Sequence, residues 1–167
     1  MKKNKKFFKV LSVFIIGMMC FICTTAPTKT SAATSASSTR TLLYRHYNGK
    51  DHYYTTKFGV VPGYKFEQVV GYVYTAKYNS ALTPVYRYYN GTDHFYTSEW
   101  GELGSGRNGY KYEGIEFYAT TKPDSASHSV FPVYRYYNGT EHFYTPHWDE
   151  LKNGDGKYKY ERIAFYI

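Results

Sequence analysis

Bulky apolar and aromatic residues alternate with polar residues over short stretches of this chain, and the alternation returns three times. Residues 64–67, 110–113 and 158–161 each place rings between charged side chains, which is typical of strands that bury one face. Short aromatic and β-branched runs on both sides of Asn-Gly pairs predict hairpins. Beyond the first 39 residues no apolar period of ordinary helical length appears, so the pattern predicts an all-β protein.

An internal repeat organises this pattern. Tyr44, Tyr86 and Tyr134 open three copies of one motif, spaced by 42 and 48 residues. Each copy reads Tyr-Arg-x-Tyr-Asn-Gly, continues through an acidic residue, His and an aromatic-Tyr-Thr run, and ends in a second block that begins Tyr-Lys. We therefore predict a single three-repeat β domain over residues 41–167, with repeats at about 41–82, 83–130 and 131–167.

Four strands per repeat, or twelve in all, predict a β-trefoil-like fold with three pseudo-symmetric repeats. Six strands would form a short barrel and three hairpins would cap it, which would leave few open strand edges. A small Greek-key sandwich and an open array of aromatic hairpins remain the alternatives. The longer connections that carry Trp100 and Trp148 each predict one helical turn before a Gly-rich loop.

The first 33 residues have a different composition. A lysine-rich start, an apolar run over residues 10–23 and a small, hydroxylic stretch predict a secretory signal peptide that is cleaved after Ala32 or Ala33. The apolar run is short for a membrane span, and the alternatives are an uncleaved anchor or a lipid anchor at Cys20 or Cys23. Residues 34–40 predict a disordered Ser/Thr linker.

The net charge of +8 changes meaning once it is located along the chain. Six of the 21 basic residues precede residue 34 and no acidic residue does, so 15 basic residues face 13 acidic ones in the remainder. This weak excess does not favour nucleic acid as a partner. Both cysteines lie in the leader, so the mature chain has no disulfide, thiolate nucleophile or Cys-ligated zinc.

An acidic residue precedes histidine once in every repeat. The pairs are Asp51-His52, Asp93-His94 and Glu141-His142. Adjacent strand residues point to opposite faces, and no Ser or Cys nucleophile stands at a recognisable elbow, so we expect no catalysis. Either the carboxylate caps the Asn-Gly hairpin while the imidazole packs, or both side chains contact a ligand. We expect no metal or cofactor, although three repeat-related histidines would form a metal cluster if they met on one axis.

An arginine in the first block and a glutamate in the second also recur. These are Arg45, Arg87 and Arg135, with Glu67, Glu113 and Glu161. Matching charges within each repeat predict an ion pair, with the guanidinium also stacking on a ring. The alternative is that the arginines bind an anionic ligand.

The motifs Tyr86-Arg87-x-Tyr89-Asn90, His94-Phe95-Tyr96-Thr97 and Tyr112-Glu113-Gly114-Ile115 carry a family resemblance. They resemble a tandem extracellular repeat family of unknown function, found in secreted bacterial proteins and often beside hydrolase domains. The resemblance covers nearly all of residues 42–167 and implies a non-catalytic module that binds a surface or a glycan. The first repeat departs from the pattern, with Gln68-Val69 in place of Gly-Ile and Phe58 in place of tryptophan.

The leading hypothesis is a secreted, monomeric, non-catalytic module that recognises carbohydrate or cell-wall glycan through repeated weak sites. Twenty-two tyrosines are too many to bury completely, and exposed rings suit the apolar faces of sugars. The expected ligand-binding residues are Asn48, Asp51, His52, Asn90, Asp93, His94, Trp100, Asn138, Glu141, His142 and Trp148. The alternative is a module that binds an extracellular protein, such as an enzyme inhibitor or a toxin-like factor. Neither hypothesis includes stable membrane insertion after cleavage.

Overall fold

The computed structural model describes residues 40–123 and 130–167, and these residues form nine strands and two short helices. The strands are β1 (Arg40–Tyr47), β2 (His52–Thr55), β3 (Lys65–Tyr74), β4 (Leu82–Tyr89), β5 (His94–Thr97), β6 (Lys111–Thr120), β7 (Pro132–Tyr137), β8 (His142–Thr145) and β9 (Lys159–Tyr166), and the helices are α1 (Trp100–Leu103) and α2 (Trp148–Leu151). The all-β prediction and the two predicted helical turns are confirmed. The predicted signal peptide and residues 34–39 of the predicted linker lie outside the described residues, and Arg40 already belongs to β1.

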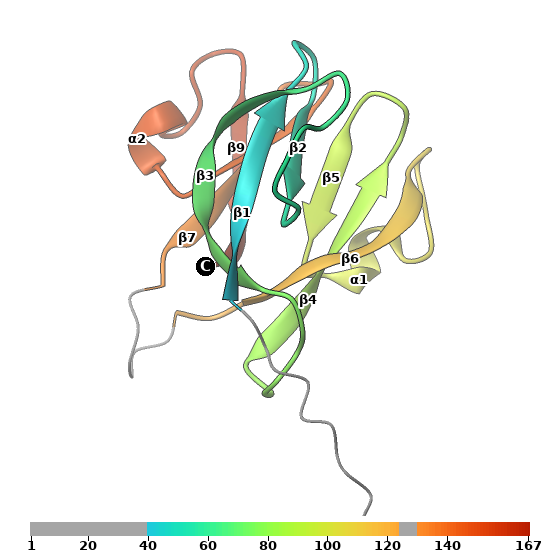
Figure 1. Cartoon of the computed structure of the whole chain (residues 1–167). Coiled ribbons are helices and arrows are strands. Elements are labelled where there is room, and N and C mark those ends of the chain that lie inside the picture. Colours follow the sequence, from blue (N-terminus) through green and yellow to red (C-terminus); the bar gives the residue numbers. More distant parts are fainter. Residues whose placement is uncertain (1–39, 124–129) are drawn as a thin grey trace, which may run out of the picture. The chain divides into compact units, whose positions relative to one another are not determined.

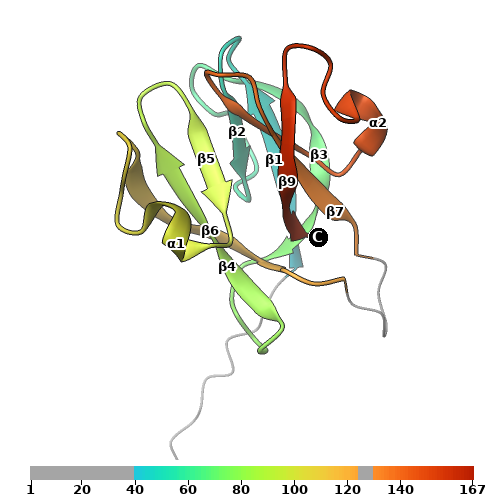
Figure 2. The same ribbon diagram turned by 180° about the vertical axis from the view of Figure 1, so that it is seen from behind.

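Each repeat folds into a three-stranded antiparallel unit. β1 and β2 form a hairpin, and β3 returns along the other side of β1. β4, β5 and β6 repeat this arrangement, as do β7, β8 and β9. Figure 1 shows the three hairpins with their return strands, and Figure 2 shows them from behind. Single residue pairs, Tyr74 with Tyr118 and Thr120 with Tyr166, join the return strands β3, β6 and β9.

The prediction of four strands per repeat is wrong. The second block was expected to form two strands, but it forms one continuous return strand, as Lys111–Thr120 does in the second repeat. Register shifts between Val85 and Tyr86 and between Arg87 and Tyr88 bend this strand pair without ending it, as β-bulges do. The described strands form one antiparallel sheet that stays open in its backbone pairing, and the trefoil-like arrangement is not confirmed.

The Asn-Gly corner of each hairpin has a local cause. Oδ1 of Asn90 accepts hydrogen bonds from the N–H groups of Thr92 and Asp93, both at 2.9 Å. Gly91 adopts a φ of 102°, which lies in the left-handed region that favours glycine. Asn48 and Asn138 accept the same pair of hydrogen bonds in their own turns. The predicted hairpin turns are therefore confirmed.

Three buried tyrosines, which we call the tyrosine triangle, connect the hairpins to one another. The hydroxyl of Tyr96 accepts the N–H of Tyr54 and donates to its carbonyl oxygen, both at 2.8 Å. Tyr144 binds the backbone of Tyr96 in the same way, and Tyr54 binds the backbone of Tyr144, so the six hydrogen bonds close a circle. The three rings meet edge to face with centroids 5.3–5.6 Å apart. Each hydroxyl thus serves backbone groups of a short strand that pairs with only one other strand.

The apolar core lies around the same strands and shows one exchange between repeats. Val85 pairs with Phe117 and Val133 with Phe165, whereas Leu43 of the first repeat pairs with Gly71. The carboxyl-terminal Ile167 fills the space that a ring occupies in the other repeats. Its Cδ1 lies 2.5 Å from the position that a Cβ on Gly71 would take.

The predicted ion pair within each repeat is confirmed. The Nε–Oε2 distances are 2.8 Å for Arg45–Glu67, 2.7 Å for Arg87–Glu113 and 2.7 Å for Arg135–Glu161. The guanidinium groups also stack on rings of a neighbouring repeat, at Phe143, Tyr53 and Phe95. The arginines therefore join the repeats as well as pairing within them.

Each arginine also binds a second glutamate, and the first repeat requires a substitute for one of them. Arg135 donates to Glu102 of α1 at 3.0 and 3.1 Å, and Arg45 donates to Glu150 of α2 at 3.1 Å. The first repeat has a shorter connection with no helix to present such a glutamate. Arg87 instead binds Glu116, a residue of its own return strand.

Glu116 also reproduces the contact that a helix glutamate makes with a strand. It accepts hydrogen bonds from the hydroxyl of Thr55 at 2.9 Å and from the N–H of Thr56 at 3.0 Å. Strand register places Val70 and Ala164 at the corresponding positions of the other repeats. A single carboxylate in the second repeat therefore replaces what the shortened first repeat lacks.

The tyrosine triangle predicts that Tyr96→Phe lowers the free energy of unfolding by about 2–4 kcal/mol, because a buried N–H and a buried carbonyl each lose a partner. Urea denaturation followed by circular dichroism measures this change. Tyr112→Phe is the matched control, since Tyr112 is 37% exposed and should change stability by less than about 0.5 kcal/mol. Equal effects of the two substitutions would contradict the role of the triangle.

The substitution Glu116→Ala should lower the free energy of unfolding by about 2–3 kcal/mol, because Arg87 and the Thr55 end of β2 both lose a partly buried carboxylate. Glu99→Ala removes an ion pair with Arg162 whose side chains are 51% and 43% exposed, and should cost about 0.5 kcal/mol or less. Chemical denaturation of both variants checks the contrast. A Glu116→Ala protein as stable as the parent would show that the replacement carboxylate is dispensable.

Candidate functional site

The acidic residue and the histidine of each predicted pair bind partners in different repeats. Asp51 accepts the backbone N–H of His94 at 2.9 Å and contacts its Nδ1 at 2.5 Å. The hydroxyl of Tyr64 donates to the same carboxylate at 2.6 Å. We call such a set a corner triad, and the three triads are Tyr64–Asp51–His94, Tyr110–Asp93–His142 and Tyr158–Glu141–His52. They link the first repeat to the second, the second to the third and the third to the first.

Burial gives the corner triads an architectural role. The three carboxylate residues are at most 1% exposed, and every carboxylate oxygen already accepts a hydrogen bond. Burial, reinforced by the hydrogen bond to Asp51, raises the pKa of Tyr64 far above its ordinary value, and Tyr110 and Tyr158 behave alike beside their own carboxylates. These hydroxyls therefore remain protonated donors. The geometry leaves the six acid and histidine side chains little surface for a ligand.

A cleft of about 450 Å³ lies beside the corner of the first repeat, and we call it the corner cleft. Tyr47 and Phe66 supply rings to its wall, Asn48 an amide, Lys65 an amine and Glu67 a carboxylate. Tyr47 stacks on the buried His52 with centroids 4.2 Å apart, which holds the ring in place. Asn48 is thus the one predicted site residue of this repeat that lines an open hollow, while Asp51 and His52 are buried.

Exposed rings gather on the second and third repeats. Cluster two consists of Tyr86, Trp100 and Tyr112, with centroids 4.9–6.1 Å apart. Cluster three consists of Tyr134, Trp148 and Tyr160, with centroids 4.9–6.2 Å apart. Trp100 is 43% exposed and Trp148 is 36% exposed, so each cluster offers indole surface to solvent. Both predicted tryptophans therefore lie at the surface, each inside a cluster of the same composition.

The helical turns fix the tryptophans in position. Leu103, the last residue of α1, is buried among Tyr88 and Phe95. The hydroxyl of Tyr88 donates to the carbonyl of Gly104 at 2.8 Å, which holds the end of the turn. Tyr136 makes the same hydrogen bond to Lys152 at the end of α2. Trp100 and Trp148 accordingly lie on anchored turns.

Sequence reasoning missed several residues of these surfaces. Lys65, Phe66 and Glu67 line the corner cleft, and Tyr86, Tyr112, Tyr134 and Tyr160 complete the two clusters. Their recurrence at matching repeat positions was the available signal. The register that brings the ends of the return strands beside the hairpins was not readable from the repeat. Glu102 and Glu150, next to the tryptophans in sequence, bind Arg135 and Arg45 and so are engaged.

Two further searches of the described residues gave negative results. No group of three or more His, Asp or Glu side chains within residues 40–123 and 130–167 is arranged to hold a metal ion. In that same part of the chain, no helix has the length and apolar character needed to cross a membrane.

Opposing effects act on the ionisation of Glu102 and Glu150. Burial disfavours the charged form of both, but hydrogen bonds from Arg135 and Thr97 outweigh burial and lower the pKa of Glu102 below 4.5. Hydrogen bonds from Thr145 and Arg45 likewise lower the pKa of Glu150. A carboxylate with a lowered pKa stabilises the fold fully above its unfolded-state pKa and loses that contribution as the pH falls through its folded-state pKa.

The substitution Glu150→Gln should therefore be most harmful near neutral pH. We expect urea midpoints of the parent and the variant to differ most at about pH 6 and to converge towards about pH 3, because the parent loses the same charge on protonation. Asp149→Asn, at the exposed neighbouring position of α2, is the control and should follow the parent at every pH. A constant difference between parent and Glu150→Gln across this range would contradict the electrostatic interpretation.

The comparisons with known proteins agree with the repeat structure. The model of a family described as "Domain of unknown function (DUF5648)" matches the chain twice, over residues 26–120 and 60–167. The two overlapping matches fit a tandem repeat family of unknown function. Neither the curated proteins nor the solved structures contain a significant match. The chain belongs to the DUF5648 family.

Proposed function

We propose that this protein is a secreted, non-catalytic module that binds carbohydrate, such as a cell-wall glycan, through its exposed aromatic clusters. The observation that carries the proposal is the recurrence of one tryptophan-centred cluster on two repeats, with Trp100 43% and Trp148 36% exposed. Packing alone does not require two large rings to remain in water. A repeated exposed ring is therefore best explained by a repeated ligand.

The chemistry of the clusters suits a sugar. An indole face covers the C–H face of a pyranose, and tyrosine hydroxyls at the edge of the cluster exchange hydrogen bonds with sugar hydroxyls. The corner cleft of the first repeat adds a related surface, with the rings of Tyr47 and Phe66 beside the polar groups of Asn48 and Glu67. A shallow, open surface of this kind supports weak binding at each position.

Repetition would strengthen weak binding to a polymer. When one site holds a glycan chain, the other sites meet the same polymer at a high effective concentration. The corner triads, the tyrosine triangle and the arginine pairs connect the repeats, so the sites keep fixed relative positions. A rigid arrangement avoids the entropic penalty of ordering separate modules on binding.

The arrangement of the carboxylates supports a non-catalytic role. Glycoside hydrolysis requires two carboxyl groups on either side of the scissile bond. Glu102 and Glu150, the carboxylates nearest in sequence to the tryptophans, each bind an arginine of a neighbouring repeat. Secretion rests on the leader predicted over residues 1–33, and an extracellular location would place the module beside the polymers it is proposed to bind.

The proposal predicts that the mature chain is retained by insoluble polysaccharide and that Trp100→Ala and Trp148→Ala each weaken retention about tenfold, the loss expected from one aromatic stack. A glycan array identifies the sugar class, and pull-down on peptidoglycan and chitin measures affinity. Tyr78→Ala, which removes a 50% exposed ring outside the clusters, is the control and should bind as the parent does. Absence of binding to every glycan tested, or equal binding by the tryptophan variants, would refute the proposal.

A further inference from the structure

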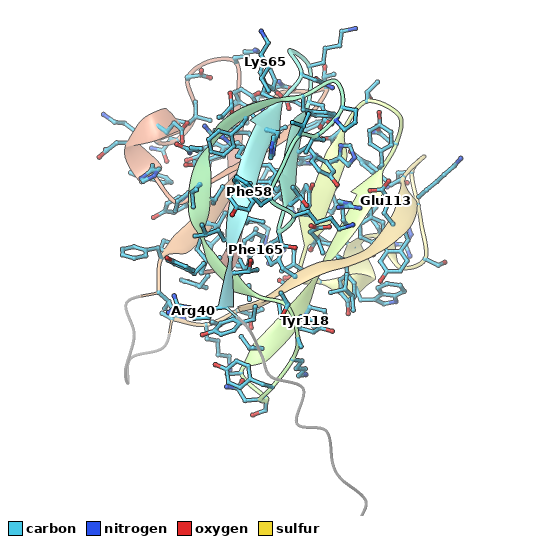
Figure 3. The ribbon with its side chains drawn as sticks, in the orientation of Figure 1. Arg40, Phe58, Lys65, Glu113, Tyr118 and Phe165 are labelled. Atoms are coloured by element: carbon cyan, nitrogen blue, oxygen red, sulfur yellow. The ribbon has the colours of Figure 1, made fainter. Side chains whose placement is uncertain are left out.

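The first repeat carries an apolar surface that the other repeats do not match. Phe58 is 89% exposed, Val60 93%, Phe66 58%, Tyr72 52% and Val69 41%, and we call these five residues the repeat-one face. The residues that correspond to Phe58, namely Trp100 and Trp148, are 43% and 36% exposed. Phe58 lies over strands β1 and β3 in Figure 3. Exposed apolar surface of this extent marks an interaction site.

A shortened connection uncovers this face. Thr55 and Tyr64 are nine positions apart, whereas the corresponding Thr97 and Tyr110 are thirteen positions apart and enclose α1. A hollow of about 380 Å³ is lined mainly by Tyr44, Phe58, Val60 and Phe66, with His46 in its wall. His46 is 2% exposed and its Nδ1 has no hydrogen-bond partner.

The surroundings of the repeat-one face are basic. Residues 41–82 contain five basic and two acidic residues, a net charge of +3, whereas residues 83–130 carry −2 and residues 131–167 carry 0. Both acidic residues of the first repeat are engaged, Asp51 by His94 and Glu67 by Arg45. Lys57 adjoins Phe58 and Lys65 adjoins Phe66 in sequence, and the structure gives neither amine an ion pair. Lys65 starts β3, opposite the end of β1 (Figure 3).

The charges restrict the partner that covers this face. A second copy of the chain would bring two positive surfaces together, which disfavours self-association. A polyanion without apolar groups would leave Phe58 and Val60 in water. A lipid surface with anionic headgroups supplies both requirements, because apolar side chains enter the boundary between headgroups and acyl chains while lysines remain among the phosphates.

We propose that the repeat-one face docks reversibly on membranes that contain anionic lipid, with Phe58 and Val60 entering the headgroup region and Lys57 binding phosphate. This activity goes beyond glycan binding, which involves Trp100 and Trp148 on the other two repeats. Docking of this kind is interfacial and requires no spanning segment. The protein would thereby bind a polymer and a lipid surface through different repeats.

Vesicle flotation tests the proposal with the chain from Ser35 onward, since the described residues belong to a compact unit with its own core and the predicted leader would itself bind lipid. The probes are phosphatidylcholine vesicles with and without about 30% phosphatidylglycerol. We expect binding only to the anionic vesicles, and at least a tenfold loss in the double variant Phe58→Ser/Val60→Ser. Phe131→Ser, at another exposed phenylalanine (59% exposed), should bind as the parent does.

A second pair of variants separates charge from apolar insertion. Lys57→Gln should weaken binding about fivefold, and Lys77→Gln, outside the face, should leave it unchanged. Thermal unfolding and polysaccharide retention should be the same in all variants. The proposal is overturned if the parent binds neither vesicle, if Phe58→Ser/Val60→Ser binds as the parent does, or if that variant instead abolishes a dimer or an acidic protein complex detected by sedimentation without any vesicle binding.

Discussion

The structure depends on hydrogen bonds from side-chain hydroxyls to backbone groups at the inner strands. Tyr54, Tyr96 and Tyr144 each satisfy an N–H and a carbonyl of another repeat, and each is buried to within 2% of complete exclusion from solvent. Four-residue strands with one sheet partner would otherwise present unpaired backbone groups to the core. The hydroxyls thus join the repeats where no backbone ladder does, and they explain how a domain without cysteine after its leader holds three repeats together.

Much of what recurs in the sequence maintains this assembly. The acid–histidine pairs have the composition of a binding or catalytic site, yet each carboxylate is used by the histidine of the next repeat and by a buried tyrosine. Arg87 and Glu116 show the same constraint from another side, because the carboxylate moved to a different element when the helix of one repeat was absent. Recurrence therefore identifies the joints between repeats first, and function resides in the recurring rings that remain outside, around Trp100 and Trp148.

The sequence predicted what depends on local chemistry. The Asn-Gly turns, the all-β class, the helical turns and the Arg–Glu pairs all follow from residue type and spacing within one repeat. It did not predict contacts between repeats, because Asp51 and His94 are 43 positions apart and nothing local specifies their register. The strand count was wrong for a related reason, since a bulge and a strand end look alike in a pattern of alternation. The candidate site was predicted in part: Trp100, Trp148 and Asn48 lie at open surfaces, while the acids and histidines are buried.

The central claim is that the cyclic contacts make the three repeats one cooperative unit. Native-state hydrogen exchange of the backbone amides of Tyr54, Tyr96 and Tyr144 tests it most directly, because each amide donates to the hydroxyl of a different repeat. The account predicts that all three amides exchange only through global unfolding, with a common free energy of opening equal to that from denaturation. Rapid exchange at any one of them, or three separate opening free energies, would contradict the account.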